Sequence, residues 1–325
     1  MRGKFAFPLV ALVSALVCGA ADYAREADDF LRGKPADAQL MQAQAIRRAI
    51  EGDPESLSAV RHARRPAVQL PDGVTAADLQ GKYRLYRAKS AAGKVLPLLV
   101  YLHGGGWTFG SIQSCAAFCG ALAADGRVAV LAVEYRLAPE HPYPAALDDV
   151  SAALRFAREN AAKLGVDPGR ISAGGDSSGG NLAIAASLRH PGELRSLVLF
   201  YPVTKAWNDG SESWRKYPHA LFGGEVMEAF DAAYCGKHDP HDPLISPACA
   251  SDAALRSLPP MLLVAADRDI LRDQGREFFD RAAAANEKFC RYVRLPGSVH
   301  LFITVPGQPS AFRDAVELTA DFLGQ

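Results

Sequence analysis

The 325-residue chain has no excess of charge of either sign, because lysine plus arginine and aspartate plus glutamate both number 36. A nucleic-acid-binding surface needs a cluster of basic side chains, so this balance argues against a nucleic-acid partner. The chain also lacks internal repeats and low-complexity tracts, which excludes a repeat architecture. Hydrophobic residues make up 49% of the chain, enough to bury the core of one large α/β domain with an accessory segment.

A hydrophobic run long enough to span a membrane is also missing. The apolar stretch at residues 5–17 follows the basic residues Arg2 and Lys4 and precedes small residues at 18–20. This order is typical of a secretory signal peptide, here residues 1–20, with cleavage near Ala20. We therefore expect an exported protein, periplasmic or secreted, with no membrane span in the mature chain. Val17 is a poor fit to the small residue that lipidation of Cys18 requires, but the sequence leaves that modification open.

Patterns of metal ligands are absent as well. No cysteine and histidine residues have the spacing of a structural zinc site, and His238 and His241 lie in a proline-containing loop, so we expect no metal. Five cysteines follow the leader, namely Cys115, Cys119, Cys235, Cys249 and Cys290. An odd number leaves at least one thiol unpaired. Cys235 and Cys249 are the pair best placed to close a loop, whereas Cys115 and Cys119, one helical turn apart, have poor disulfide geometry.

Strand and helix patterns alternate through most of the chain. Strand patterns occupy residues 82–87 (an edge strand), 95–102, 128–133, 170–173, 197–201, 261–265 and 289–295, and helix patterns occupy 115–124, 144–164, 181–188, 273–285 and 309–323. This alternation predicts an α/β fold with a mostly parallel sheet and helices on both faces. We expect the core in two parts, 81–202 and 259–325, with cap helices at 21–80 and a cap or insertion segment at 203–258.

The pattern Gly-x-Ser-x-Gly surrounds Ser177, with Gly175 and Gly179 at the fixed positions. A strand-like run precedes it and helix-forming residues follow it, which is the context of a nucleophile elbow. Such a turn holds the serine in a strained backbone conformation and has no room for side chains on the flanking glycines. A glycine-rich turn without chemistry is the alternative, and this motif alone does not decide between the two.

A serine hydroxyl is a weak nucleophile at neutral pH, so it needs a base and an acid that orients the base. In sheets of this type these residues follow in the order serine, acid, histidine. Asp267, Asp269 and Asp273 follow the strand pattern at 261–265, and His300 follows the pattern at 289–295. These positions predict a triad of Ser177, one of the three acids and His300.

A run of three glycines follows the buried strand at 95–102, in His103-Gly104-Gly105-Gly106-Trp107. Glycines at this place let backbone N–H groups approach the negative oxygen that develops in acyl transfer. The second part of such an oxyanion hole is the N–H of the residue after the nucleophile, which is Ser178 here.

These motifs together resemble the hormone-sensitive-lipase-like branch of the α/β-hydrolase esterases. The resemblance rests on HGGGW at 103–107, YRLAPEHPYPAA at 135–146, GDSSGGNLA at 175–183, Ser246-Pro247 and Leu258-Pro259-Pro260, and covers about residues 80–322. It implies an α/β-hydrolase fold with a helical cap. The sequence departs from the branch pattern at Ser178, Ile270, Ser298 and Leu301.

The resemblance also implies roles for the motif residues. Ser177, Asp269 and His300 form the triad, with Asp267 as the reserve acid, and Gly105, Gly106 and Ser178 supply the oxyanion hole. The residues that support these motifs are His103, Gly104, Gly175 and Gly179.

The function implied is that of a serine carboxylesterase without a cofactor, acting on a small-molecule ester with a short acyl chain, such as acetyl. Two alternatives stay open. The same scaffold can hydrolyse amides or peptides, and a relative can bind ligands without catalysis. The sequence indicates neither the natural substrate nor the oligomeric state.

Overall fold

A computed structural model of the chain describes residues 20–35, 37–63, 68–218, 223–286, 288 and 290–324. Residues 1–19, which hold most of the predicted signal peptide and Cys18, lie outside the described residues. No helix among the described residues is both long and apolar enough to cross a bilayer.

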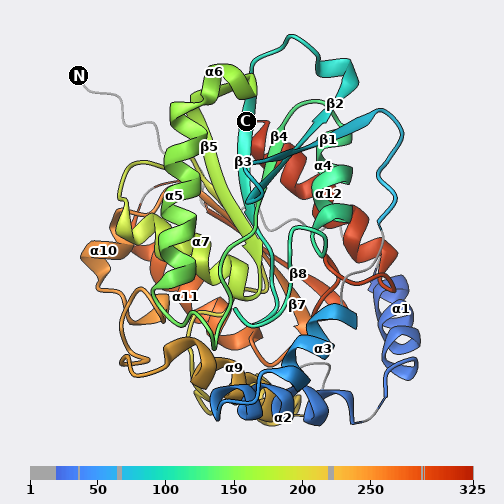
Figure 1. Cartoon of the computed structure of the whole chain (residues 1–325), viewed down its shortest axis with the longest axis vertical. Helices are drawn as coiled ribbons and strands as arrows, with labels where there is room; N and C mark the ends of the chain where they lie inside the picture. The colour runs from blue at the N-terminus through green and yellow to red at the C-terminus, as the bar shows by residue number, and fades with distance from the viewer. Residues whose placement is uncertain are drawn as a thin grey trace, which may run out of the picture.

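An eight-stranded sheet forms the centre of the molecule, in the order β1-β2-β4-β3-β5-β6-β7-β8 (Figure 1). Strand β2 is antiparallel to both of its neighbours, and the pairs from β4 to β8 are parallel. The bounds are β1 Val74–Leu79, β2 Tyr83–Ala88, β3 Leu96–Leu102, β4 Ala129–Val133, β5 Val166–Asp176, β6 Leu197–Phe200, β7 Met261–Arg268 and β8 Cys290–Val299. Every residue of β4 and β6 is buried, as expected for parallel strands covered on both faces. The predicted mostly parallel sheet is confirmed.

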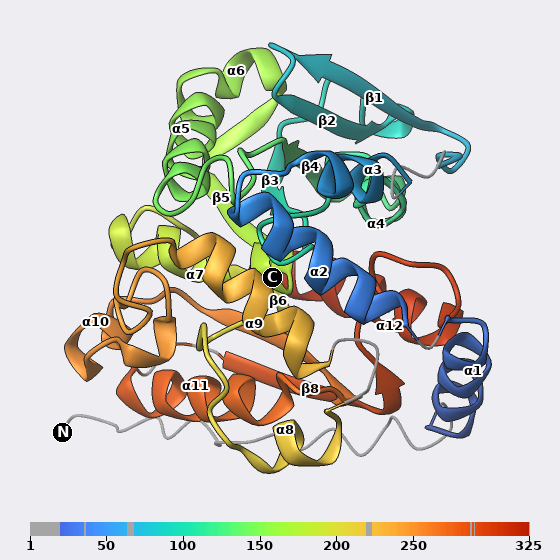
Figure 2. The same ribbon diagram turned by 60° about the horizontal axis from the view of Figure 1, so that its bottom comes forward.

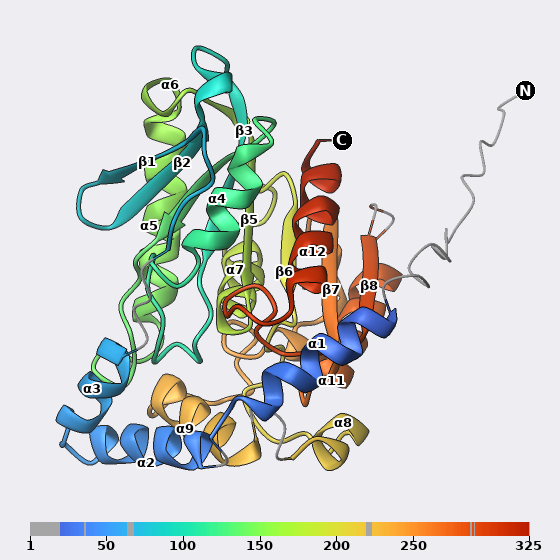
Figure 3. The ribbon, with the colours of Figure 1, turned by 90° about the vertical axis from the view of Figure 1, so that its right-hand side faces the viewer.

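Helices cover the two faces of this sheet (Figure 3). One face carries α4 (Ala116–Ala124) and α12 (Pro309–Leu323), whose buried Phe118 and Phe322 belong to one apolar cluster. The other carries α5 (Ala145–Glu159), α7 (Ser178–Arg189) and α11 (Arg272–Ala285). The single helix expected at 144–164 is divided, because α5 ends at Asn160 and a short helix α6 (Ala161–Leu164) follows.

A helical cap lies beyond the carboxyl ends of the central strands, at the bottom of Figure 1. It contains α2 (Ala38–Ile50), α3 (Glu55–Ala63), α8 (Glu212–Lys216) and α9 (Gly224–Cys235). Helix α2 packs along α9, so the N-terminal segment and the 203–258 segment meet (Figure 2). The rest of that segment holds η3 (Pro247–Cys249) and α10 (Asp252–Arg256), and η2 (Lys89–Ala91) follows β2.

Two features of the N-terminal segment differ from the expectation of cap helices throughout residues 21–80. Helix α1 (Ala20–Arg32) packs on β8 and α12 rather than in the cap. Strand β1 extends the sheet and pairs with β2, so β2 is not the edge strand that its pattern predicted. Four of the six residues of β1 are exposed. A strand that is exposed on both faces needs no apolar face, so its sequence lacks the alternating pattern that predicts a strand.

Cys235 and Cys249, the pair best placed to close a loop, do not form a disulfide. Cys235 is buried at the end of α9 as part of the apolar core, and both cysteines are free thiols. The other three cysteines after the leader are also free. Burial raises the pKa of the Cys235 thiol to about 12, which keeps it protonated and unreactive.

Candidate active site

Ser177 lies in the tight turn between the end of β5 and the start of α7. Its backbone dihedral angles are φ 55° and ψ −118°, a strained region for a residue with a side chain. The turn is fixed from below, since Ser177 N donates to Phe200 O over 2.9 Å. A Cβ added to Gly175 or Gly179 would collide with the carbonyl oxygen of Leu102, which ends β3. The two glycines are therefore required by the close approach of β3 to the turn.

Asp269 and His300 follow the adjacent parallel strands β7 and β8, and their side chains meet beyond the carboxyl ends of these strands. The Nδ1 atom of His300 lies 2.5 Å from Oδ2 of Asp269. Both side chains are buried, with 2% of Asp269 and 3% of His300 exposed. The other carboxylate oxygen of Asp269 accepts a hydrogen bond from Leu271 N at 2.9 Å, which fixes the orientation of the carboxylate.

The other two acids considered for this position have different partners. Asp267 accepts a hydrogen bond from Gly297 N at 2.9 Å. Asp273 accepts one from Ser213 N at 2.8 Å and pairs with Arg272. Of the three candidate acids, the structure thus brings only Asp269 to His300.

Ser177 and His300 both lie beside the end of β6. Ser177 N binds the carbonyl of Phe200, and the ring of Tyr201, the next residue, lies 4.2 Å from the His300 ring between centroids. Ile303 N donates to the hydroxyl of Tyr201 at 3.2 Å, so this tyrosine also holds the loop that carries the histidine. Tyr201 carries no sequence motif, and only its position directly after a buried strand marks it.

The glycine loop 103–107 follows β3 and lies beside the elbow. Gly105 and Gly106 have φ angles of 122° and 59°, which glycine adopts without strain. Within the described part of the chain, their N–H groups donate to no protein oxygen. The N–H of Ser178 is at the first position of α7, where a helix offers no internal acceptor. These three predicted donors are thus free to bind an anion.

Asp176 connects the three parts of the site, and the sequence did not reveal this role. Its Oδ1 accepts hydrogen bonds from Gly104 N at 3.0 Å and from the Tyr101 hydroxyl at 2.9 Å. Its Oδ2 accepts one from Thr304 Oγ1 at 2.7 Å, on the loop after His300. Asp176, which directly precedes Ser177, therefore binds both the glycine loop and the histidine loop through its buried carboxylate.

His103 supports the glycine loop from beneath. Its ring stacks on Tyr135 with 4.2 Å between centroids, and the Tyr135 hydroxyl donates to the His103 carbonyl at 2.6 Å. Burial lowers the pKa of His103, so its ring is neutral at pH 7 and acts as a packing group. Arg61 of α3 holds the same region from outside, because it donates to the carbonyls of Thr108 and Ala138 and pairs with Glu140.

The cap closes over this constellation with aromatic side chains. Phe230 of α9 lies where a side chain on Gly106 would be, and Trp107 stacks on Tyr234 with 4.2 Å between ring centroids and an angle of 3°. Only 6% of Ser177 is exposed. The cap therefore shields Ser177 from solvent at the carboxyl ends of the strands.

Comparison with known proteins identifies the family of this fold. A family model for the α/β hydrolase fold matches residues 99–304. The chain belongs to the α/β-hydrolase fold family.

Two curated relatives and one solved structure show the kind of hydrolase. Carboxylesterase NlhH of Mycobacterium tuberculosis is 37% identical over 225 residues, covering 66% of this chain and 70% of its own length. Ethyl acetate hydrolase of Pseudomonas putida is 38% identical over 211 residues, covering 63% and 65%. The crystal structure of the carboxylesterase EstE1, from a metagenomic library, superposes with a TM-score of 0.74 at 33% identity, covering 85% of this chain and 98% of EstE1. The predicted resemblance to the hormone-sensitive-lipase-like branch is confirmed, and this hydrolase is an enzyme of the carboxylesterase class.

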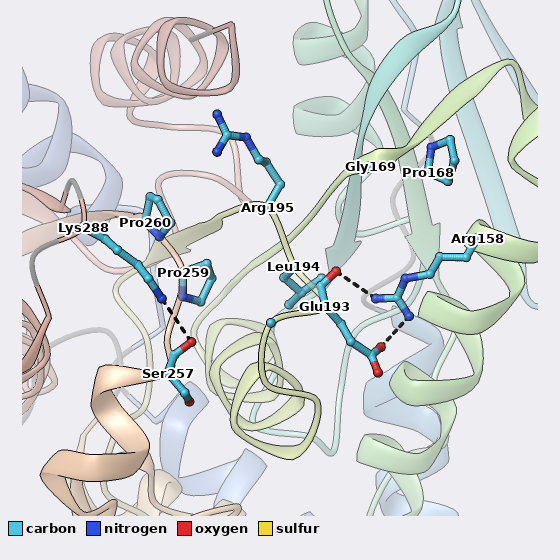
Figure 4. Close-up of a pocket in the computed structure, with 11 residues that line it drawn as sticks. Arg158, Pro168, Gly169, Glu193, Leu194, Arg195, Ser257, Pro259, Pro260 and Lys288 are labelled. Carbon is cyan, nitrogen blue, oxygen red and sulfur yellow. Dashed lines mark hydrogen bonds and ion pairs between the residues drawn. The ribbon is translucent and has the colours of Figure 1, made fainter.

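The hydrolase also has a hollow of about 560 Å³ at the opposite ends of the strands (Figure 4). Its lining includes Pro168 at the start of β5 and Pro260 just before β7, so it lies at the amino ends of the strands. Three of the charged groups there already have partners, since Arg158 pairs with Glu193 and Lys288 donates to the carbonyl of Ser257, while Arg195 is exposed to solvent. Ligands of parallel α/β sheets bind at the carboxyl ends, where Ser177 lies. This hollow is therefore not the candidate active site.

Among the described residues, no group of three or more histidine, cysteine, aspartate or glutamate side chains is placed to hold a metal ion.

Proposed function

We propose that this hydrolase cleaves short-chain carboxylic esters, acetyl esters above all, with Ser177 as nucleophile, His300 as base and Asp269 as the acid that orients the base. The observation that carries the proposal is the buried contact between Asp269 and His300. It lies at the carboxyl ends of the strands, as does the strained turn of Ser177. A carboxylate beside Nδ1 fixes the imidazole tautomer that leaves Nε2 free to accept a proton.

The first half of the reaction transfers the acyl group to the enzyme. Ser177 Oγ forms a bond to the ester carbonyl carbon while its proton moves to His300 Nε2. The carbonyl oxygen becomes negative and accepts hydrogen bonds from the N–H groups of Gly105, Gly106 and Ser178. His300 then gives its proton to the leaving alcohol oxygen as the carbon–oxygen bond breaks.

The second half returns the enzyme to its starting state. Water adds to the acyl carbon as its proton moves to His300. The same backbone donors stabilise the negative oxygen. The bond to Ser177 Oγ then breaks, the serine recovers its proton, and the carboxylic acid leaves. Removing one such donor typically raises the barrier by about 3 kcal/mol.

The preference for short acyl chains rests on the cap. Phe230 packs directly against Gly106, and Phe109 packs edge-on against Phe230 with 5.5 Å between ring centroids, so space above the glycine loop is restricted. One relative is named an ethyl acetate hydrolase, and ethyl acetate is an acetyl ester. Both observations favour an acetyl or similarly small acyl group.

The test is a series of p-nitrophenyl esters of increasing acyl length, run beside p-nitroacetanilide and with the Ser177→Ala variant as control. We expect kcat/KM to fall for acyl chains beyond about eight carbons, because a capped pocket has a finite volume, and we expect the Ser177→Ala variant to be inactive. Faster hydrolysis of long-chain emulsions than of acetate would contradict the acyl preference. A rate on the anilide equal to that on the ester would favour an amidase, and ligand binding without any turnover would favour a non-catalytic relative.

We also propose export after cleavage near Ala20, on the basis of the leader pattern in residues 1–20. N-terminal sequencing of the protein from a periplasmic or culture-medium fraction tests this. An intact Met1 on protein confined to the cytoplasm would contradict it.

A further inference from the structure

Helix α1 packs against the loop that carries His300, which runs from the end of β8 to the start of α12 (Figure 3). It contacts the end of β8 before the histidine and the loop after it. The proposed reaction does not use α1.

The first contact lies three residues before the histidine. Gly297 has a φ of 79°, and a Cβ added to it would lie 2.8 Å from the Cβ of Ala24 on α1. Arg268 joins the same two segments, because it donates to Gly297 O at 2.9 Å and pairs with Asp28 of α1 at 2.7 Å.

The second contact lies after the histidine. Gly307 has a φ of 137°, and a Cβ added there would collide with the ring of Phe30. Phe30 and Ala27 of α1 also form a small apolar cluster with Val299, the residue before His300. The apolar face of α1 therefore holds both ends of the loop.

Gln308 transmits the position of this second contact to the histidine backbone. Its Oε1 accepts from Val299 N at 2.9 Å, and its Nε2 donates to the carbonyls of Val299 at 3.0 Å and His300 at 3.3 Å. Gln308 is 1% exposed, so water does not compete for these bonds. Its amide replaces the neighbouring strand that Val299 lacks on this side.

Glu26 provides the third contact, at the start of α12. Its carboxylate accepts hydrogen bonds from Ser310 N at 3.0 Å and Ser310 Oγ at 2.8 Å. A carboxylate at this position caps the free N–H groups of a helix and interacts favourably with its dipole.

We propose that α1 is a positioning element for His300, and that Phe30, Glu26 and Gln308 are its positioning residues. The inference rests on the proposed function, because it concerns the base of that reaction. Gly297, near the end of β8, and Gly307, in the loop, both have positive φ, and strand pairing ends at Val299, so the side chains of α1 and Gln308 hold the loop in place. A displacement of about 1 Å between reacting groups can lower a rate about 100-fold.

The experiment measures kcat and KM for p-nitrophenyl acetate in Phe30→Ala, Glu26→Ala and Gln308→Met. We expect kcat to fall about 10- to 100-fold, with KM unchanged, because these residues touch the histidine loop and not the substrate. The proton NMR signal of the His300 Nδ1–H donated to Asp269, assigned by its loss in His300→Ala, should broaden or move upfield in all three. Phe30→Leu should restore most of kcat, because it refills the contact with Gly307.

Two controls separate positioning from general loss of stability. Arg25→Ala removes an exposed side chain of α1, and Leu154→Ala opens a cavity in α5, away from the loop. Both should keep the parent kcat and the NMR signal, and Leu154→Ala should lower Tm about as much as Phe30→Ala does. The inference is overturned if Glu26→Ala and Phe30→Ala keep kcat and the NMR signal, or if Leu154→Ala loses as much kcat as they do. If His300→Ala itself retains activity, the proposed function fails instead.

Discussion

Asp267 and Asp269 are separated by one residue at the end of β7, yet they hold different parts of the site. Asp269 is buried against the His300 ring, whereas Asp267 binds the backbone of Gly297 and lies 3.4 Å from Arg294 at the surface. Residues two apart in a regular strand point to the same side, so the difference arises from the irregular end of β7. The register with β8 shifts between Ala266 and Arg268, and Asp269 lies just beyond the last residue of the strand.

The two acids should respond differently to the same substitution. Asp269→Asn is expected to lower kcat by about 10⁴-fold, because an amide does not hold the imidazole in the productive tautomer. Asp267→Asn keeps an oxygen that accepts from Gly297 N, so its kcat should stay close to that of the parent. Steady-state kinetics of both variants on p-nitrophenyl acetate check this. The opposite order of effects would assign the triad acid to Asp267.

Gly179→Ala is expected to be strongly destabilising and inactive, although alanine is the better helix former. The new Cβ would collide with Leu102 O and would lie 2.6 Å from His103 O, both backbone atoms that cannot yield easily. Overpacking of this kind costs about 1–3 kcal/mol or more.

The matched control for this substitution is Gly275→Ala in α11, where the nearest atom to the new Cβ is Pro202 O at 4.0 Å. This variant should gain up to about 1 kcal/mol from helix propensity. Urea unfolding of the pair measures both effects. Equal stabilities of the two variants would show that the elbow is not packed as described.

Part of the site could be predicted from sequence because its residues belong to short motifs. Gly105, Gly106, Ser177 and Ser178 are close in sequence to the strands that position them, and Asp269 and His300 each follow a recognisable strand. Asp176 and Tyr201 could not be predicted in the same way. Their partners, Tyr101 and Thr304 for Asp176 and His300 for Tyr201, lie 75 or more residues away in the chain. Only the packed sheet brings them together.

At the level of helices and strands, the sequence patterns predicted the buried strands and the amphipathic helices of the core. They did not predict the exposed strand β1 or the helix α1. Strands β3, β4, β6 and β7 lie within a few residues of their expected bounds, since continuous apolar runs mark strands covered on both faces. Strand β1 and helix α1 gave no comparable signal. The sequence of α1 is rich in charged residues, and its small apolar side covers a loop rather than the sheet.

Helix α9 of the cap contains a buried acid that makes the stability of the enzyme depend on pH. Asp231 is 7% exposed, and within the described residues neither of its carboxylate oxygens has a hydrogen-bond partner. Burial, helped by the nearby charge of Glu228, raises the pKa of Asp231 well above its ordinary value of 3.8. The folded protein therefore keeps this carboxyl protonated at pH values where the unfolded chain has released the proton.

The sign of the effect follows from this difference. The contribution of Asp231 to stability is fully present below the unfolded pKa and is lost as pH rises toward the folded pKa, because the unfolded state then binds fewer protons. Asp231→Asn has no proton to lose. Its Tm relative to the parent should therefore increase between pH 4 and pH 8, by an amount that grows with pH. A Tm difference that is constant across this range would show that Asp231 titrates alike in both states.

In the molecule as a whole, the carboxyl and amino ends of the sheet strands have different roles. The carboxyl ends of the strands gather the elbow, the glycine loop and the histidine loop beneath the cap, while the amino ends carry a hollow in which Arg158 already pairs with Glu193. The architecture could be predicted from the alternation of strands and helices. The cap could not be predicted in detail, because α2 and α9 pack on each other from segments nearly 200 residues apart, and neither segment alone shows its partner.

The most direct measurement is the mass of the protein after reaction with phenylmethylsulfonyl fluoride, with peptide mapping of the modified residue. We expect one sulfonyl group per chain, on Ser177, appearing in step with the loss of esterase activity, and a much slower reaction in His300→Ala. Full loss of activity with the label on another residue, or a fully active protein that carries the label on Ser177, would contradict it.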